Sequence, residues 1–307
     1  MSQPSSPIGV FITPVTPLQQ NCTTVWCTRT NKAAVIDPGG SADAILAEIA
    51  RRGLTLDAIW ITHGHLDHAG GAAVMQEKAC VDIIGPHAAD QFWIDLIPTQ
   101  GQSYGLPDAR TFVPARFLTD GDTVTLGETI WEVLHCPGHT PGHVVFFNRE
   151  ARFAQVGDVL FQGSIGRTDF PRSDHPALLN AITTKLWPLG DDVTFVPGHG
   201  PHSTFGAERR TNPYVSDQAM ARAPWPDPLP APPDLASRQK ADNHADAEGI
   251  EAGPQRLVPN GGARPFDAVI GPCAGFGGVL THGDVDGGGL RSLGDDGVGL
   301  LPQPHTL

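Results

Sequence analysis

The sequence predicts a layered α/β or α+β domain followed by a long tail of different composition. Over roughly the first 220 residues, short β-branched or aromatic runs bounded by Gly, Pro or Asp alternate with amphipathic helical segments. Hydrophobic residues make up 40% of the 307 residues, which is enough for a substantial core. After Pro224 the chain is rich in Gly, Asp and Pro and loses its periodicity. We therefore expect a folded domain over residues 8–220 and a disordered tail over residues 221–307.

Seven segments are predicted as strands, because they are short, apolar and flanked by turn residues. They are residues 23–28, 33–36, 58–62, 81–84, 129–134, 144–147 and 193–196. Helices are predicted after Ser41, over 71–79 and over 176–186. Ser41 is a candidate N-cap of the first helix, and Gly53 is its stop signal. Strands interleaved with helices predict helices layered on a largely buried sheet system.

Charge and cysteine content narrow the function. Lys and Arg number 20 against 33 Asp and Glu, and the net charge of −13 disfavours nucleic acid and anionic membranes as partners. The first ten residues carry no basic n-region and no apolar h-region, so no signal peptide is expected, and no apolar run approaches the length of a membrane span. The five cysteines are scattered without C-x-x-C spacing, which predicts a reducing, cytoplasmic setting. They are Cys22, Cys27, Cys80, Cys136 and Cys273.

The segment ITHGHLDHAGG, residues 61–71, places three histidines and an aspartate within six positions after an apolar run. These are His63, His65, Asp67 and His68. Such a cluster is much rarer than a lone histidine, and imidazole and carboxylate are ligands that suit zinc, iron and manganese. The segment therefore predicts a metal site.

Three further motifs supply the same ligand types. CPGHTPGH contains His139, VGDV contains Asp158 and VPGHGPH contains His199. Each motif follows a strand-like run and lies in a Gly- or Pro-marked turn, where a side chain can be presented at the edge of a sheet. Taken alone, a histidine such as His199 is more often a turn residue, but four motifs together favour one shared site.

We assign the candidate ligands to two divalent cations, with zinc as the first choice and iron or manganese as alternatives. His63, His65 and His139 would hold one ion, and Asp67, His68 and His199 the other. Asp158 would bridge the two ions, and Asp67 is also predicted to be catalytic. Two such ions can hold a hydroxide between them and lower its pKa toward neutrality.

The remaining histidines and Cys136 are given structural interpretations. Cys136 is predicted to be a small buried hydrophobic residue rather than a nucleophile. The histidines outside the scheme are predicted to be surface, turn or supporting residues, namely His87, His135, His143, His175 and His202.

With these motifs in their order along the chain, the sequence resembles the metallo-β-lactamase superfamily. Within it, the sequence is most similar to short bacterial glyoxalase II-like proteins, which are hydroxyacylglutathione hydrolase-like proteins without a C-terminal helical domain. QNCTTVWC, AAVIDPGG, HCPGHTPGHVVFF, GRTDFPR and LGDDVTFVPGHGPHST carry the resemblance, which covers about residues 8–215. It implies a four-layer αββα sandwich with the dinuclear site at one edge of the sheets.

The resemblance also implies a reaction, in which the bridging hydroxide attacks the carbonyl of a thioester. The expected substrate is a small hydroxyacylglutathione-like molecule of the S-D-lactoylglutathione type. The longer enzymes of this group hold glutathione through the helical domain that is replaced here by the tail. The resemblance therefore does not decide whether glutathione is the thiol of the substrate. Arg167 is a candidate to bind a substrate carboxylate, with a structural ion pair to Asp158, Asp169 or Asp174 as the alternative.

Other functions are weighed against this one. GRTDF also occurs in related mononuclear iron persulfide dioxygenases, in which only His63, His139 and Asp158 would bind metal. A hydrolase acting on another thioester or ester is a further alternative. A metal-carrying scaffold is disfavoured because all seven ligand positions carry competent residue types.

We predict that deleting residues 225–307 leaves metal content and hydrolysis nearly unchanged, because all candidate ligands precede the tail. Metal analysis and turnover of the truncated protein, compared with the full chain, test this. A truncated protein that precipitates or loses its metal would show that the tail contributes to the fold.

Overall fold

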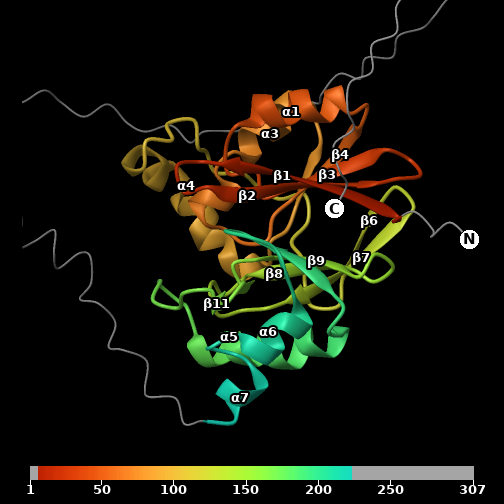
Figure 1. The fold of residues 1–307 in the computed structure, drawn as a ribbon. Coiled ribbons are helices and arrows are strands. Elements are labelled where there is room, and N and C mark those ends of the chain that lie inside the picture. Colours follow the sequence, from red (N-terminus) through yellow and green to blue (C-terminus); the bar gives the residue numbers. More distant parts are fainter. Residues whose placement is uncertain (1–5, 223–307) are drawn as a thin grey trace, which may run out of the picture. The chain divides into compact units, whose positions relative to one another are not determined.

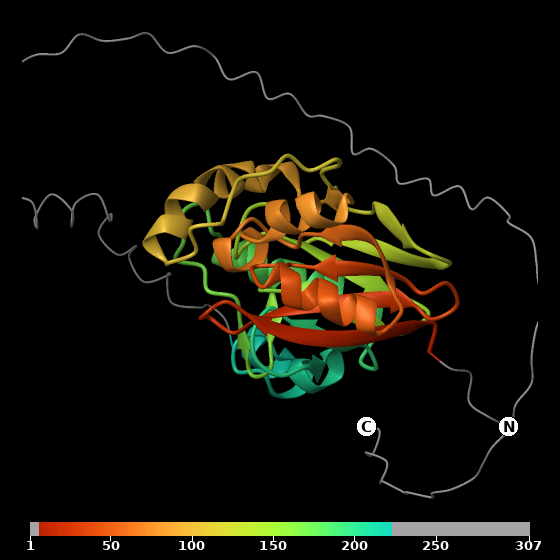
Figure 2. The same ribbon diagram turned by 90° about the horizontal axis from the view of Figure 1, so that it is seen from above.

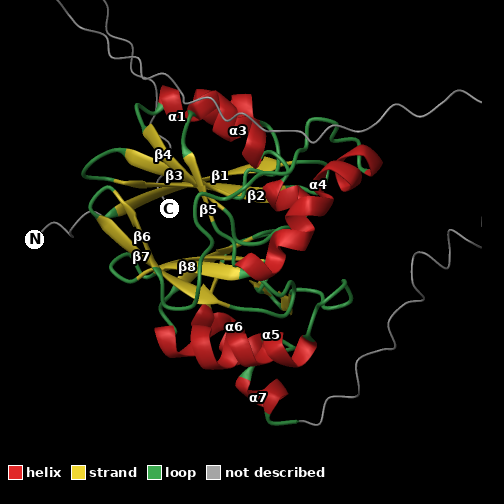
Figure 3. Ribbon diagram, turned by 180° about the vertical axis from the view of Figure 1, so that it is seen from behind, coloured by secondary structure: helices red, strands yellow, loops and turns green. Residues whose placement is uncertain are grey.

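The computed structural model describes residues 6–222, which form two β-sheets stacked face to face with helices on both outer faces (Figure 1). The four layers run helix, sheet, sheet, helix, and they are clearest with helices and strands coloured separately (Figure 3). The αββα arrangement implied by the resemblance is therefore confirmed.

The first sheet has five strands in the order β1-β2-β3-β4-β5. β1 to β3 are antiparallel neighbours, whereas β3, β4 and β5 run parallel. Helices α1 and α3 cover its outer face and α4 lies at one end (Figures 1 and 2). The strands are β1 (Ile8–Val15), β2 (Gln20–Cys27), β3 (Lys32–Ile36), β4 (Thr55–Trp60) and β5 (Asp82–Ile84), and the helices are α1 (Ala42–Arg51), α2 (Leu66–Ala69), α3 (Ala72–Ala79) and α4 (Gln91–Ser103).

The second sheet has six strands in the order β13-β12-β9-β8-β7-β6, with β9 and β12 parallel and the other neighbours antiparallel. Helices α5 and α6 cover its outer face (Figure 1). The strands are β6 (Thr123–Leu126), β7 (Thr129–His135), β8 (Val144–Asn148), β9 (Phe153–Gly157), β12 (Thr194–Pro197) and β13 (Ser203–Thr204). A small hairpin of β10 (Leu160–Phe161) and β11 (Ser164–Ile165) follows β9, and the helices are α5 (His175–Ala181), α6 (Phe205–Thr211) and α7 (Asp217–Met220).

Three apolar clusters hold the layers together. The central cluster lies between the sheets, where the Trp60 ring packs against Trp131 and Phe146 at centroid distances of 5.5 and 5.1 Å. A second cluster packs the first sheet against its helices through residues such as Ile45. A third packs the second sheet against α5 and α6 through residues such as Leu178. Strands buried on both faces explain why many of them read as continuous apolar runs.

Each predicted strand matches an observed one within a few residues, whereas β1, β6, β9 and the two-residue strands β10, β11 and β13 were missed. The predicted helix 176–186 is α5 followed by a wider π-type turn over Ile182–Leu186. The N-cap prediction for Ser41 is wrong in its mechanism. Ser41 adopts a left-handed conformation with φ of 57° and makes no side-chain capping hydrogen bond. Gly53 does end the helix, at a positive φ of 67°.

The predicted tail lies almost entirely outside the described residues, as do the short apolar segments 266–270 and 278–280. Between residues 6 and 222, no helix is both long enough and apolar enough to cross a membrane.

Candidate metal centre

The candidate ligands follow four strands whose ends lie at one edge of the two sheets. After β4, a loop carries His63 and His65 and the short helix α2 carries Asp67 and His68, and loops after β7, β9 and β12 carry the other three residues. Because β3 runs parallel to β4 and β9 parallel to β12, the carboxyl ends of each pair lie together. A hydrogen bond of 2.7 Å from Asn21 N to Gly198 O joins the two sheets at this edge. The topology thus brings residues far apart in sequence into one cluster.

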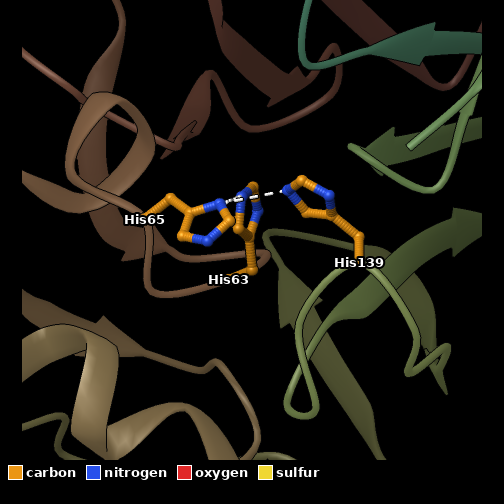
Figure 4. A group of neighbouring side chains, drawn as sticks. All are labelled: His63, His65 and His139. Carbon is orange, nitrogen blue, oxygen red and sulfur yellow. Dashed lines mark hydrogen bonds between the residues drawn. The ribbon is translucent and has the colours of Figure 1, made fainter. Parts of the chain in front are cut away.

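The first group of donors consists of His63, His65 and His139, all buried (Figure 4). Nδ1 of His65 lies 3.1 Å from Nε2 of His63 and 3.0 Å from Nε2 of His139. Zinc–nitrogen bonds of about 2.0–2.1 Å place tetrahedral donors roughly 3.3 Å apart. The three ring nitrogens therefore converge at a spacing suited to one metal ion.

The second group consists of Asp67, His68 and His199. Oδ2 of Asp67 lies 3.1 Å from Nε2 of His199 and 3.7 Å from Nε2 of His68. The His68 side chain is fully buried, whereas that of His199 is 30% exposed. This group is therefore the more accessible of the two.

Asp158 lies between the two groups. Its Oδ1 is 3.4 Å from Nε2 of His68 in the second group. Its Oδ2 is 3.5 Å from Nε2 of His139 in the first group and 3.8 Å from Nε2 of His199 in the second. One carboxylate thus faces both groups of donors.

The buried Asp37 carboxylate orients two of the rings. His68 Nδ1 donates to Asp37 Oδ2 at 3.0 Å, which directs Nε2 toward the centre. Thr62 Oγ1 donates to the same oxygen at 2.6 Å, so this hydroxyl accepts from His63 Nδ1 at 3.0 Å. His63 Nε2 is therefore also left with its lone pair toward the centre.

His139 is oriented in the same way by the backbone. Its Nδ1 lies 2.8 Å from the carbonyl oxygen of Arg167 and donates to it, leaving Nε2 as the free base. His65 differs, because its Nδ1 is the atom that faces the other rings.

The protonation states of the first group and of Asp158 suit metal binding, which requires neutral imidazole and ionised carboxylate, whereas the carboxylates of Asp158 and Asp67 outweigh burial and raise the pKa of His68 and of His199. Burial is the main cause that lowers the pKa of His63, His65 and His139, to about 3 for His65. Burial would raise the pKa of Asp158, but the positive charge of His68 and its neighbours outweighs burial and lowers it. At neutral pH the first group is therefore uncharged and Asp158 is ionised.

Two orphaned atoms show that the donor set fits a cation. Nε2 of His68 and Oδ1 of Asp158 are buried, lie 3.4 Å from each other and have no other hydrogen-bond partner among residues 6–222. Leaving such an atom unsatisfied costs about 1–3 kcal/mol, which coordination would offset. Gly198 makes room for them, because a Cβ there would lie 2.0 Å from Asp158 Oδ1.

Sequence reasoning missed Asp37 and left open whether His143 is a surface, turn or supporting residue. Asp37 groups with His63 and His68 by distance, but Thr62 and His68 already use its oxygens, so we treat it as a support. The Asp37 position had a signal, because it also follows an apolar strand, in AAVIDPGG.

His143 lies directly behind the centre. Its ring stacks on His63 at 4.6 Å, and its Nε2 accepts a hydrogen bond of 3.0 Å from the backbone N–H of Asp158. The repeated G-H in CPGHTPGH was the signal for this residue.

Arg167 forms the structural ion pair considered as its alternative role. Nε and a terminal nitrogen each lie 2.6 Å from an oxygen of Asp169. The guanidinium also lies over the Phe170 ring, 4.5 Å from its centroid. The structure therefore places this cation beside the centre, already paired.

The predictions for Cys136 and two of the other histidines are confirmed. Cys136 is fully buried, and burial raises the pKa of its thiol to about 12, which removes it as a nucleophile. His87 and His135 stack on each other at 4.2 Å, outside both groups of donors.

The sequence profile of the Metallo-beta-lactamase superfamily matches residues 15–199. Hydroxyacylglutathione hydrolase GloC of Haemophilus influenzae is 44% identical over 213 residues, which cover 69% of this chain and 100% of that protein. Probable metallo-hydrolase YqgX of Bacillus subtilis is 33% identical, over 66% of this chain and 95% of that protein. The chain therefore belongs to the metallo-β-lactamase superfamily, as its motifs predicted.

Two solved structures agree with this family assignment. The crystal structure of BLEG-1 B3 metallo-beta-lactamase has a TM-score of 0.63 and 32% identity, and covers 67% of this chain and 99% of its own. The crystal structure of TTHA1623 in a di-iron-bound form has a TM-score of 0.61 and 35% identity, over 67% of this chain and 100% of its own. These similarities and the His/Asp cluster show that the protein has a metallo-hydrolase fold with a site for divalent metal.

We predict that Asp158→Ala lowers both the metal content and the rate, because it removes the carboxylate that faces both groups of donors and leaves two nearby cations without a charge between them. Elemental analysis after dialysis measures the first effect. Asp192→Ala is the control, since Asp192 is an exposed carboxylate that precedes β12 and pairs with Arg152. An Asp158→Ala protein that keeps two ions and full activity would contradict the bridging role.

Proposed function

We propose that the protein is a metal-dependent thioester hydrolase of the hydroxyacylglutathione hydrolase type. The observation that carries the proposal is the convergence of two groups of donors on the Asp158 carboxylate. The identity with the Haemophilus enzyme, over the full length of that enzyme, supports the substrate class. The proposed enzyme domain is residues 8–220, with a small-molecule substrate in the cytoplasm.

In this proposal His63, His65 and His139 would hold one divalent cation, and Asp67, His68 and His199 would hold a second, with Asp158 shared. Zinc is the first choice, and iron is supported by the di-iron form of the TTHA1623 structure. Such cations, when bound, lower the pKa of water toward neutrality and polarise a carbonyl oxygen.

The side chains of the protein have the remaining roles. Asp67 is the proposed catalytic residue, because its carboxylate lies in the more accessible group and can accept a proton at Oδ2. The pKa of Asp67 is lowered, since the charge of His68 outweighs the effect of burial, so this carboxylate is ionised at neutral pH. The oriented rings of His63, His68 and His139 keep their Nε2 atoms available throughout.

The surroundings of the first group suggest where the substrate lies. Phe170 lies 4.7 Å from His65 and 5.6 Å from His139 between ring centroids, and Trp93 lies 4.5 Å from His65. These aromatic rings provide apolar surface beside the reacting atoms and limit the access of water there.

Two arginines border this aromatic surface. Arg167 lies over Phe170, and Arg172 lies over Phe92 at 4.1 Å. Arg167 is paired with Asp169, whereas no ion pair among residues 6–222 involves Arg172. We propose that Arg167 and Arg172 bind a carboxylate of the thiol part of the substrate, which suits glutathione.

The intact second group favours the hydrolase over a mononuclear iron dioxygenase. A mononuclear site would leave Asp67, His68 and His199 without a ligand role, although their donor atoms lie together. Metal stoichiometry and oxygen uptake with glutathione persulfide distinguish the two reactions.

We predict that the purified protein hydrolyses S-D-lactoylglutathione, followed as loss of the thioester absorbance. His65→Ala should lower the rate by at least about a hundredfold, because a metal ion contributes several kcal/mol to the transition state. The exposed His202, which has no place in either group, provides the control His202→Ala. A metal-loaded protein that hydrolyses no thioester would reject the proposal.

We also predict that Arg172→Gln and Arg167→Gln each raise KM for S-D-lactoylglutathione by about tenfold, corresponding to the loss of about 1.4 kcal/mol from a charged hydrogen bond. The kcat should change little, and a thioester of uncharged N-acetylcysteamine should be unaffected. Arg149→Gln is the control, because Arg149 pairs with Glu132 on the surface. Equal KM changes for both thioesters would argue against carboxylate binding.

A further inference from the structure

Asp90 is a buried carboxylate that has no place among the proposed ligands. It ends the short 3₁₀ turn Ala88–Asp90 and precedes helix α4, with no exposed surface. It makes no side-chain capping hydrogen bond to α4, so the helix does not account for its burial. Burying a carboxylate without strong hydrogen bonds would be costly. Its partners therefore explain why it is there.

The Asp90 partners belong to the two loops that supply the first group of donors. Oδ2 accepts from the backbone N–H of Gly64 at 2.9 Å and from Thr140 Oγ1 at 2.8 Å. Oδ1 accepts from the backbone N–H of Gly142 at 2.5 Å. Gly64 lies between His63 and His65 in the sequence, and Thr140 follows His139. One carboxylate thus ties the loop of the first sheet to the loop of the second.

The packing around these bonds leaves little freedom. A Cβ at Gly142 would lie 2.6–2.7 Å from Asp90 N, Cβ and Cγ, and one at Gly64 would lie 3.0 Å from Asp90 O. Both loops therefore approach Asp90 as bare backbone. A shift of either loop would break a short hydrogen bond to a buried charge.

The three hydrogen-bond donors to Asp90, Gly64 N, Thr140 Oγ1 and Gly142 N, each require an acceptor, and an ionised carboxylate offers only acceptors. Burial raises the pKa of Asp90 to about 6, although the three hydrogen bonds oppose the rise. Asp90 is therefore mostly ionised at pH 7 and above. An asparagine of the same shape would turn an NH₂ group toward one of the donors.

We propose that Asp90 is a positioning residue for the first metal site, which sets the distance between the His63–His65 segment and His139 through the backbone of both loops. This inference rests on the ligand assignment in the proposed function. The spacing that it controls is the separation of 3.0 Å between His65 Nδ1 and His139 Nε2. Groups that orient metal ligands in this way typically account for about 10–100-fold in metal affinity.

The test compares Asp90→Asn with Glu208→Gln in the full-length protein. Glu208 is a comparable buried carboxylate, because it also accepts three hydrogen bonds, from Ser203 Oγ, Gly163 N and Asn212 Nδ2. It lies on α6, outside both groups of donors. Both variants lose a buried acceptor and should lose stability. Only Asp90→Asn should weaken binding of Zn²⁺, by about 10–100-fold in competition with a chromophoric chelator.

A spectroscopic readout separates positioning from general destabilisation. The visible absorption of the Co²⁺-loaded protein should shift in Asp90→Asn and stay as in the parent in Glu208→Gln. Equal Zn²⁺ affinity and unchanged Co²⁺ spectra in both variants would overturn the inference and leave the proposed hydrolase intact. A parent protein that binds neither ion would overturn the ligand assignment and the inference together.

Thr140 provides a milder pair of variants, in case Asp90→Asn does not fold. Thr140→Val removes the hydroxyl that donates to Asp90 Oδ2 and keeps the shape of the side chain. Thr140→Ser retains the hydroxyl. Zn²⁺ affinity should fall severalfold in the first and return to the parent value in the second. Equal affinities for valine, serine and threonine would contradict the role of the loop connection.

Discussion

The hydrogen bonds of the buried Asp37 carboxylate control much of the metal centre. Asp37 follows β3, and its oxygens accept from Thr62 N, Thr62 Oγ1 and His68 Nδ1. Through the Thr62 hydroxyl it also orients His63, so one carboxylate fixes a ring in each of the two groups of donors. Without it, three buried donors would lose their acceptor, and both rings would be free to present the wrong nitrogen. The orientation of the candidate ligands therefore depends on a residue outside the proposed ligand set.

The layered fold makes these supporting hydrogen bonds possible, because it brings the loops at the strand ends together. Parallel pairs at the same edge of the two sheets place the loops after β4, β9 and β12 beside one another, and the loop after β7 joins them. Asp37 stabilises the loop of the first sheet, His143 supports the backbone of Asp158, and Asp90 connects the His63–His65 segment to the His139 loop. Each of these residues acts between segments that are distant in the sequence. Rigid strand ends and short hydrogen bonds together provide the preorganisation that metal catalysis needs.

Much of the fold could be predicted, because most strands are continuous apolar runs bounded by turn residues. The strand β1 was missed since Gly9 and Pro14 weaken its pattern, although an edge strand tolerates proline and the Trp26 ring fills the space beside Gly9. Helix α4 was missed because Pro98 and Gly101 lie within it. The burial of Trp93, Ile94 and Ile97 outweighs those weak local preferences.

The sequence by itself determined the superfamily and the seven candidate ligands, because the ligand motifs are short, local and chemically unusual. The division of these ligands into two groups was also predicted, and the distances in the fold agree with it. Only the tertiary structure decided which oxygen of Asp158 faces which ring, and that Arg167 is paired with Asp169. It alone revealed the roles of Asp37, His143 and Asp90, since a single buried polar residue has no periodic signal. The physical reason is that hydrogen bonds between loops depend on distances of about 3 Å across the fold, which local sequence patterns do not encode.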